Sequence, residues 1–394
     1  MGQLVRESTP VVVVGAGPAG LTVANLLLRV GVPCVVLERR SRAHVERRQR
    51  AGIVETRAVG MFQEWGLGAR VLGGAPSDDS LEIRVDGRSR LLRYGADDGP
   101  RPLLCPQQVL VANLTAAFLD DGGDLRFEAS DITLEGLDGE RPVVRYRDTD
   151  GVTHEIACDF VAGCDGDRGV SRASVPEGEL TAYPFDHGIS WLTVLAEVPP
   201  PPHPLMAISH DGFAGHFARG PRASRFYLQC LPGDREDAWP DDRIWRTLRT
   251  RLGDEGLTAG PVTEKEVFPL RSVVHEPMRY GRLLLAGDAA HVVSPVGGKG
   301  MNLALYDAEV LVRAIRDFVD HADESGLDAY SRTCLDRTWN YQEFSRWMTE
   351  MLHDSGDDSA AGPFRRRLAR ARLDRLCRSS ASAGAFAELM AGLA

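Results

Sequence analysis

Three glycines and one glutamate near the start of the chain are spaced as in a turn that binds a dinucleotide. Gly15, Gly17 and Gly20 form a Gly-x-Gly-x-x-Gly pattern, and Glu38 stands eighteen residues after the last of them. The first glycine permits a tight turn, the second a close approach of pyrophosphate, and the third close packing of a helix on a strand. A carboxylate at Glu38 can accept hydrogen bonds from both hydroxyls of a ribose. The pattern predicts a dinucleotide site and leaves open whether FAD or NAD binds.

The residues around these glycines predict the elements that must hold them. A β-branched run over 10–15 indicates a buried strand, 20–29 a helix, and 34–37 a second strand that ends at Glu38. This β-α-β unit is the context in which the glycine pattern becomes specific. The positive end of the helix would face the phosphates.

Two further motifs follow along the chain. Residues 164–172 read CDGDRGVSR, and residues 287–291 read GDAAH, followed at 295–302 by PVGGKGMN. Each motif alone fits a loop, because Asp-Gly marks turns and small residues mark close helix packing. Their order after the glycine pattern resembles that of the class A FAD-dependent aromatic hydroxylases, and within them the para-hydroxybenzoate hydroxylase-like enzymes. The resemblance runs from Val11 to about Met351 and includes RAGIVE (50–55), GERPVV (139–144), PLRSVVHEPM (269–278) and GRLLLAGDAAH (281–291).

The resemblance implies an α/β fold: a doubly wound GR2-type FAD-binding domain, Rossmann-like, with an inserted β-sheet substrate domain and C-terminal helices. The 394 residues suit two interlocked domains. We expect the FAD-binding domain at 1–75, 101–178 and 269–345, the substrate domain at 76–100 and 179–268, and a helical segment at 346–394. Helices are expected at 56–66, 107–120, 243–253 and from about 300, and strands at 180–198, 205–231 and 282–286.

The resemblance also implies which residues bind FAD. Asp288 would bind the ribityl hydroxyls from a strand end, and a helix beginning near Gly300 would stabilise negative charge on the flavin. Lys299 would add positive charge there, or else is a solvated surface residue. The expected FAD-binding positions are Gly15, Gly17, Gly20, Glu38, Arg50, Gln107, Asp165, Asp288, Gly300, Met301 and Asn302. The expected catalytic positions beside the flavin are Pro295, Val296 and Lys299.

The nicotinamide nucleotide has no second glycine pattern to bind it, and in the resembled family it docks transiently. The matching positions are Arg39, Arg40, His44, Arg48, Arg168, Arg172 and Arg271. Arginines can hold a pyrophosphate and a 2′-phosphate bidentately, which favours NADPH over NADH. The alternative is a solvated arginine surface, because all but two of the 46 basic residues are arginine.

The substrate positions depart in part from the family's pattern. Arg219 and Tyr227 match two of the three residues that grip a substrate carboxylate, and Phe217 replaces the serine. Two tyrosines and a histidine that remove a phenol proton are replaced by Met206, Met390 and Asp78, and a threonine by Val296. Arg219 should meet an anion, from the substrate or from a protein carboxylate. Five aromatic residues either line a substrate pocket or belong to the core, and the sequence leaves both alternatives open: Trp191, Phe213, Phe217, Phe226 and Tyr227.

The implied reaction is that of a flavin monooxygenase. NAD(P)H reduces FAD, O2 adds to form a flavin hydroperoxide, and one oxygen atom passes to an electron-rich ring. We expect an anionic or electron-rich aromatic substrate other than para-hydroxybenzoate. The alternatives are para-hydroxybenzoate 3-hydroxylase proper, an oxygenase of indoles or polycyclic natural products and, in another class, a flavin-binding sensor or sequestering protein.

Composition excludes other classes. A net charge of −10 disfavours nucleic-acid binding, and no apolar stretch approaches the roughly 20 residues of a membrane span. The seven cysteines form no C-x-x-C pair, so we expect no metal site, no disulfide framework and a cytoplasmic location. His291 is expected to be a packed structural residue rather than a base. The resembled family is often dimeric, which makes a homodimer an expectation.

Overall fold

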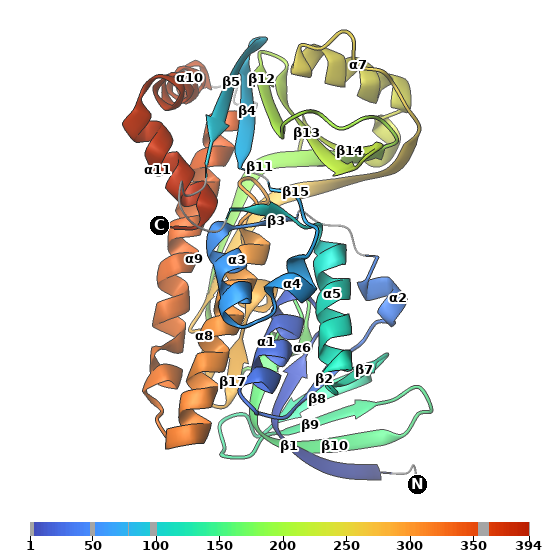
Figure 1. Ribbon diagram of the computed structural model, residues 1–394, viewed down its shortest axis with the longest axis vertical. Helices are drawn as coiled ribbons and strands as arrows, with labels where there is room; N and C mark the ends of the chain where they lie inside the picture. The colour runs from blue at the N-terminus through green and yellow to red at the C-terminus, as the bar shows by residue number, and fades with distance from the viewer. Residues whose placement is uncertain (1–3, 48–51, 78, 95–100, 354–361, 394) are drawn as a thin grey trace. The chain divides into compact units, whose positions relative to one another are not determined.

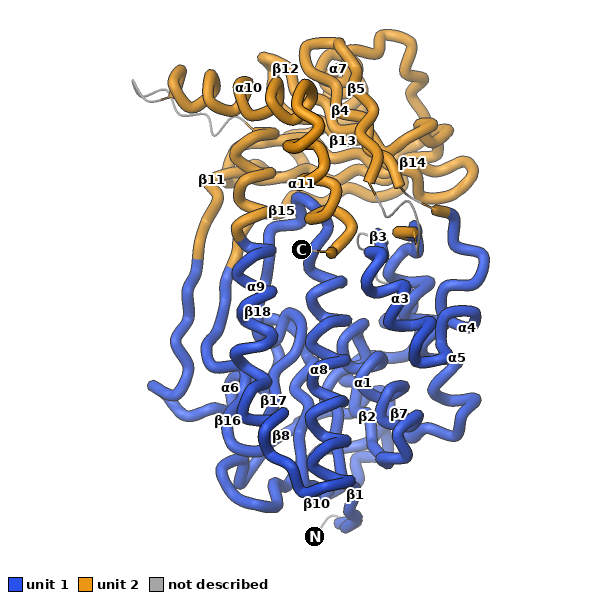
Figure 2. The backbone as a smooth tube through the Cα atoms, turned by 60° about the vertical axis from the view of Figure 1, so that its left-hand side comes forward, with its two compact units in different colours: residues 1–76, 103–184, 273–342 blue, residues 77–102, 185–272, 343–394 orange. Residues whose placement is uncertain are grey.

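The computed structural model describes residues 4–47, 52–77, 79–94, 101–353 and 362–393. The chain divides into two compact units, coloured separately in Figure 2. Unit 1 comprises Met1–Pro76, Leu103–Pro184 and Val273–Gln342. Unit 2 comprises Ser77–Pro102, Phe185–Ser272 and Glu343–Ala394.

Unit 1 is built on a sheet whose central strands are parallel. Their order is β17-β10-β1-β2-β7, and β16 and β9 pair antiparallel with β17 and β10. β8 extends the sheet beyond β9. The bounds are β1 (Leu4–Val14), β2 (Cys34–Glu38), β7 (Asp124–Phe127), β8 (Ser130–Glu135), β9 (Val143–Arg147), β10 (Thr153–Gly163), β16 (Arg279–Tyr280) and β17 (Leu283–Leu285).

The first strand begins earlier than its apolar residues predicted. The run Val11–Val14 is fully buried between β2 and β10, as expected of a central parallel strand. β1 nevertheless starts at Leu4, because 4–9 pairs with 153–158 of the long strand β10. This half of β1 is partly exposed and contains polar residues, so the sequence shows no continuous apolar run there.

Helices pack against this sheet and against one another. α1 packs between α5 and α8, as Figure 1 shows. The predicted helix over 107–120 is confirmed at α5, and the one over 56–66 at α3. The elements are α1 (Pro18–Arg29), α2 (Arg42–Val45), α3 (Thr56–Glu64), α4 (Gly68–Leu72), α5 (Gln107–Asp120), α6 (Val170–Ala173), η2 (Gly287–Ala289) and α8 (Gly300–His321), with the short strands β3 (Ile53–Val54), β6 (Leu103–Leu104) and β18 (His291–Val292).

Unit 2 holds most of a second, largely antiparallel sheet in the order β15-β11-β14-β13-β12-β4-β5. Its core lies between the sheet and α7, where Trp245 and Leu248 pack with Phe226 and Leu228. β11, β15 and the helix α9 begin or end in the residue ranges of unit 1. The bounds are β4 (Ser80–Val85), β5 (Arg88–Arg93), β11 (Thr181–Ala196), β12 (Leu205–Ser209), β13 (Gly212–Gly220), β14 (Ala223–Cys230), η1 (Glu236–Ala238), α7 (Asp241–Leu252), β15 (Val262–Glu276), α9 (Ser325–Leu352), α10 (Gly362–Arg378) and α11 (Ser380–Ala391).

The predicted α/β class is thereby confirmed, with a mainly parallel sheet, a second sheet and C-terminal helices. None of the helices in the described part of the chain is long and apolar enough to span a bilayer.

Candidate functional site

The glycine pattern forms the turn between β1 and α1. Gly15 has φ +105°, and a Cβ there would lie 2.5 Å from the Cys164 carbonyl oxygen. A Cβ on Gly20 would lie 1.9 Å from the carbonyl oxygen of Gly15. A Cβ on Gly17 would meet no described atom within 4 Å. Gly15 and Gly20 are therefore required by the fold, whereas Gly17 keeps open the space before the N-terminus of α1, where a pyrophosphate fits.

A cavity of about 370 Å³ in unit 1 adjoins this turn. Glu38 lines it from the end of β2, where its carboxylate accepts hydrogen bonds from the backbone N–H groups of Ala16 and Arg40, both at 2.8 Å. Leu37 and Ile132 add apolar surface to the same cavity. A carboxylate fixed beside an apolar slot suits a ribose next to an adenine ring.

Asp165 lines the same cavity from the Asp-Gly motif. Its Oδ2 accepts a hydrogen bond from the Ser171 N–H at 2.8 Å, whereas its buried Oδ1 has no hydrogen-bond partner among the described residues. Burial raises the pKa of this carboxyl, opposed by the Ser171 hydrogen bonds. A buried acceptor that lacks a donor fits a ligand that brings hydroxyl groups, so the residues present fit FAD.

The second acidic motif forms a short loop after β17, which we call the GD loop (Gly287–His291). Asp288 is exposed in this loop. His291 is 1% exposed, and its Nε2 donates to Oδ2 of Asp307 at 2.7 Å. Asp307 also accepts from the Gly287 N–H at 2.9 Å. His291 is thus a packed residue, and the sequence had not indicated its partner Asp307.

The loop before α8 contains a buried ion pair. Lys299 is fully buried, and its Nζ donates to Oε1 of Glu55 at 2.5 Å. The Tyr341 hydroxyl donates to the other oxygen of Glu55 at 3.0 Å. Burial lowers the pKa of Lys299, opposed by the charge of Glu55. The alternative of a solvated surface lysine is wrong, and Glu55 balances the charge that Lys299 was expected to contribute.

The remaining expected FAD positions have varied surroundings. α8 begins at Gly300, as predicted, next to the half-buried Met301. The Asn302 amide donates to the Ile53 carbonyl at 2.9 Å and accepts from the Glu55 N–H at 3.0 Å, so its side chain fastens β3 to α8. Gln107 is the first residue of α5 and is half-buried. Val296 is fully buried, Pro295 half-buried, and Arg50 lies outside the described residues.

The expected NADPH positions fall into three groups. Arg39, Arg40, His44, Arg168 and Arg271 are exposed, and Arg48 lies outside the described residues. Arg172 is half-buried. Its guanidinium donates to the Ala289 carbonyl of the GD loop at 2.9 Å and to the Asp167 carbonyl. Arg172 therefore ties the Asp-Gly motif to the GD loop.

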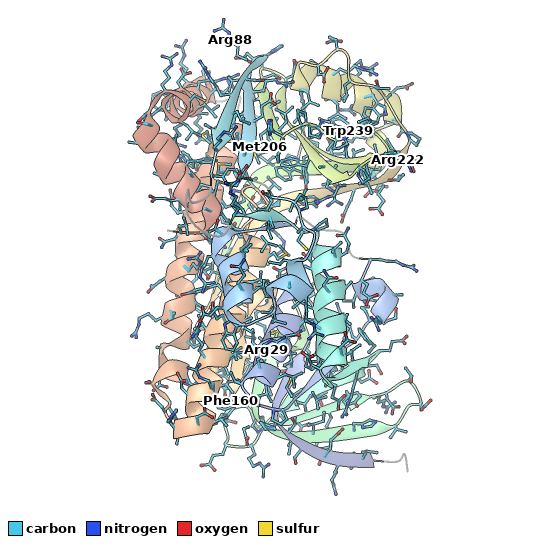
Figure 3. All side chains as sticks on the ribbon, viewed as in Figure 1. Arg29, Arg88, Phe160, Met206, Arg222 and Trp239 are labelled. Atoms are coloured by element: carbon cyan, nitrogen blue, oxygen red, sulfur yellow. The ribbon has the colours of Figure 1, made fainter. Side chains whose placement is uncertain are left out.

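Three of the expected substrate positions in unit 2 share one face of its sheet, namely Met206, Phe217 and Tyr227. Met206, Gly215 and Tyr227 stand in one row across β12, β13 and β14. Met206 lies among these strands and is 6% exposed (Figure 3). The Phe217 ring meets Tyr227 edge-on at 5.4 Å and covers Gly215, where a Cβ would lie 2.8 Å from it. This face is therefore lined by rings and a thioether.

Two more rings continue this surface, and one expected ring does not. Trp191 lies 4.7 Å from Tyr227 and 5.5 Å from Phe213, between ring centroids. Phe226 points to the opposite face, where it packs against Trp245. Of the two alternatives for Phe226, pocket or core, the structure supports the core, because successive residues of a strand face opposite sides.

Arg219 is half-buried on β13. Burial lowers the pKa of its guanidinium, and Tyr227 opposes this shift through its charge and a hydrogen bond. Met390 is buried on α11, and Asp78 lies outside the described residues. The structure thus brings Met206, Phe217 and Tyr227 together on one face, with Arg219 close to Tyr227.

A buried histidine, missed in the sequence, fixes the tryptophan of this surface. Trp191 Nε1 donates to His353 Nε2 at 2.7 Å, which leaves Nδ1 to donate to the Thr349 carbonyl at 3.0 Å. Burial lowers the pKa of His353 to about 3, so the imidazole is neutral. Its position just after α9 gave no motif that could have identified it.

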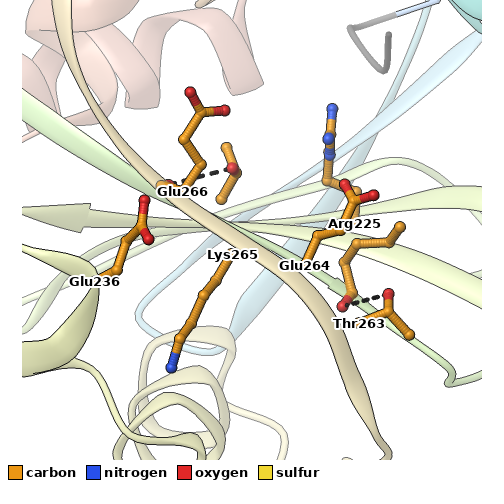
Figure 4. Close-up of a pocket in the computed structure, with 8 residues that line it drawn as sticks. Arg225, Glu236, Thr263, Glu264, Lys265 and Glu266 are labelled. Carbon is orange, nitrogen blue, oxygen red and sulfur yellow. Dashed lines mark hydrogen bonds between the residues drawn. The ribbon is translucent and has the colours of Figure 1, made fainter. Parts of the chain in front are cut away.

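A second cavity, of about 510 Å³, lies in unit 2, and its lining differs from that of the cavity in unit 1 (Figure 4). It lies where the Thr193 hydroxyl donates to the Glu266 carbonyl and the Thr263 hydroxyl to the Leu195 carbonyl. Its charged lining residues are Arg225, Glu236, Glu264, Lys265 and Glu266. Such a lining does not suit an aromatic ring. Within the described ranges, no cluster of His, Cys, Asp or Glu side chains could hold a metal ion.

Comparisons with known proteins agree with this geometry. The FAD binding domain family matches residues 8–345. The chain is 36% identical over 390 residues to a p-hydroxybenzoate hydroxylase of Acinetobacter baylyi, covering 98% of this chain and 95% of that protein. It is 26% identical over 344 residues to a probable NADH-specific resorcinol 4-hydroxylase of Rhodococcus jostii, covering 82% of this chain and 62% of that protein.

The fold has counterparts among solved structures. The p-nitrophenol 4-monooxygenase PnpA of Pseudomonas putida superposes with a TM-score of 0.81 at 20% identity, over 99% of each chain. This likeness supports the GR2-type FAD-binding fold, and the sequence match supports the chemistry. The chain therefore belongs to the FAD-dependent aromatic hydroxylases, the class A flavin monooxygenases that use NAD(P)H and O2.

Proposed function

We propose that this enzyme hydroxylates an aromatic substrate that carries an anionic group, and that para-hydroxybenzoate is at best a poor substrate. The observation that carries the proposal is the ring-lined sheet face of unit 2, where Tyr227 has Arg219 close to it. A guanidinium that loses solvation there gains free energy from a hydrogen bond to a substrate carboxylate. Hydrogen bonds between charged groups are stronger than those between neutral groups.

Two positions that carry a phenol-deprotonating tyrosine in the resembled family hold Met206 and Met390 in this chain. Met206 and Met390 carry thioethers, which neither donate nor accept a proton at neutral pH. Without such a relay, hydroxylation of a phenol that must ionise would be slowed about 10²- to 10⁴-fold. A ring that is electron-rich without ionisation, such as an aryl amine or an indole, does not need the relay.

The residues of unit 1 have the complementary role of holding FAD. Glu38 and Asp165 would accept hydrogen bonds from its hydroxyl groups, Gly17 would admit its pyrophosphate, and Asp288 would bind its ribityl chain. FAD supplies the redox chemistry when bound. Lys299, directly before α8, forms a buried ion pair with Glu55.

NADPH is the proposed reductant. Arg39 lines the cavity of about 370 Å³ in unit 1. It is exposed, as are Arg40 and His44, and these side chains would offer cationic donors to a 2′-phosphate. The test is the ratio of kcat/KM for NADPH and NADH, which we expect to favour NADPH and to fall in Arg39→Ala and Arg40→Ala. An equal or better kcat/KM with NADH would refute this part.

A cytoplasmic location and a homodimer also stay predictions.

The substrate proposal is tested with a panel of aromatic acids, anilines, indoles and phenols, scored by stimulated NADPH consumption and product mass. We expect an anionic compound other than para-hydroxybenzoate to give the highest kcat/KM. Arg219→Ala should lower that value by about 10- to 100-fold, because a charge-assisted hydrogen bond contributes about 1.5–3 kcal/mol. Arg222→Ala, an exposed arginine of the same unit, is the matched control (Figure 3).

One result would favour a second candidate. The 36% identity to a p-hydroxybenzoate hydroxylase supports that activity for this chain as well. Hydroxylation of para-hydroxybenzoate as efficiently as any other compound in the panel would establish it and overturn the proposal. An undiminished kcat/KM in Arg219→Ala would equally contradict an anion anchor.

A further inference from the structure

We propose that Asp307 is a positioning residue for FAD: it holds the GD loop, and thereby Asp288, in the conformation that binds the cofactor. Asp307 is a fully buried residue of α8. It does not belong to the three motifs that identify the FAD site, and its carboxylate contacts Gly287 and His291 of the loop.

The contacts join Asp307 to both ends of the loop. One carboxylate oxygen, Oδ2, accepts from the Gly287 N–H at 2.9 Å and from His291 Nε2 at 2.7 Å. These two residues are the first and last of the GD loop, and the exposed Asp288 stands between them. A single carboxylate on a long helix therefore fixes the span that presents Asp288.

The backbone of the loop has little room to find another conformation. Gly287 has φ +61°, and a Cβ on it would lie 3.1 Å from Cβ of Ala304 on α8 and 3.3 Å from Cβ of Ala19 on α1. The Gly287 N–H is buried against these helices and needs an acceptor, which Asp307 provides.

The electrostatics favour a charged pair. Burial lowers the pKa of His291, but the charges of Asp307 and Asp288 outweigh it and leave that pKa above its ordinary value. Other titratable groups that interact with the pair are Cys164, His275, Tyr306, Tyr330 and Cys334. A buried ion pair contributes little net stability compared with apolar residues of the same volume. Its two directional hydrogen bonds instead define one conformation of the loop.

The test measures the Kd of the apoprotein for FAD, from the quenching of flavin fluorescence, at a temperature well below unfolding. Asp307→Ala should raise the Kd about tenfold or more, since it leaves two buried donors without an acceptor. Asp307→Asn keeps an acceptor for Gly287 without the charge, so we expect a Kd between those of the wild type and Asp307→Ala. His291→Gln keeps a donor for Asp307 and should also give an intermediate Kd.

Glu309 on the same helix offers the matched control. It is 5% exposed and accepts hydrogen bonds from Arg57, Trp65 and Arg313, away from the GD loop. Glu309→Ala and Glu309→Gln should lower the thermal stability of the apoprotein but leave the Kd for FAD within about twofold, the scatter of independent sites.

Two results would overturn the proposal. One is a folded Asp307→Asn protein whose Kd for FAD equals that of the wild type. The other is an equal rise of the Kd in the Asp307 and Glu309 variants, which would mean that only overall stability matters. If Asp307→Ala fails to fold, Asp307→Asn and His291→Gln decide the question by the same comparison.

Discussion

At the scale of single residues, the fold of unit 1 buries ionisable side chains in pairs. Lys299 and Glu55 form such a pair in unit 1, and Asp307 and His291 form another. Removing one member of a buried pair leaves an uncompensated charge, which costs far more than removing both. His353 is the opposite case, a buried histidine that stays neutral because burial lowers its pKa to about 3.

Replacement of Lys299 by Met should destabilise the apoprotein by about 3–5 kcal/mol, because the buried Glu55 carboxylate loses its closest cation. The double variant Lys299→Met with Glu55→Gln should recover a large part of that loss. Urea unfolding followed by circular dichroism measures both. A single variant within ~0.5 kcal/mol of the wild type would show that the pair is not buried as described.

The neutral state of His353 predicts a pH dependence. The unfolded chain binds a proton at this histidine near pH 6.5, and the fold only near pH 3, so acid favours the unfolded state between these values. Replacement by Gln removes this effect. We expect the stability difference between wild type and His353→Gln to shrink by about 2 kcal/mol between pH 7 and pH 5.

The control for this pH dependence is Leu231→Ala, which removes an exposed side chain of unit 2 that carries no titratable group. Its stability difference from the wild type should stay constant over the same pH range. If the difference for His353→Gln also stays constant with pH, the buried histidine is not held neutral.

At the scale of elements, the turn between β1 and α1 separates residues that serve the fold from residues that serve the ligand. Gly15 and Gly20 touch backbone atoms, whereas Gly17 faces open space. The backbone of Gly17 has φ −82°, which any residue can adopt. The three positions of the motif are therefore glycine for different physical reasons, and substitutions can distinguish these reasons.

Gly17→Ala should leave the stability of the apoprotein within ~0.5 kcal/mol of the wild type, since the new methyl group meets no described atom. It should weaken FAD binding about 5- to 100-fold, because the methyl group occupies the space that the pyrophosphate needs. Gly20→Ala should instead destabilise the apoprotein by at least about 3 kcal/mol. Calorimetry of the apoproteins and FAD titration measure the two effects. An unchanged FAD affinity in Gly17→Ala would place the pyrophosphate elsewhere.

At the scale of the whole molecule, the local patterns predicted more than the long-range contacts. The strand 34–37, the helix 107–120 and the turn at Gly15 were predictable because short apolar runs and glycines encode them locally. The burial of Lys299 was not, because its partner Glu55 stands 244 residues earlier in the chain. Asp307 and His353 lie in or beside long helices, where only the packed structure shows what they contact.

The most direct test of the account is an oxygen-18 experiment with the FAD-loaded enzyme, NADPH and the best compound of the aromatic panel. As a class A flavin monooxygenase, the enzyme should oxidise NADPH only when this compound is present and transfer one atom of ¹⁸O₂ to its ring for each NADPH consumed. NADPH oxidation that yields hydrogen peroxide and no labelled product with every compound, or that does not depend on an aromatic compound, would contradict the account and favour a flavin-binding sensor.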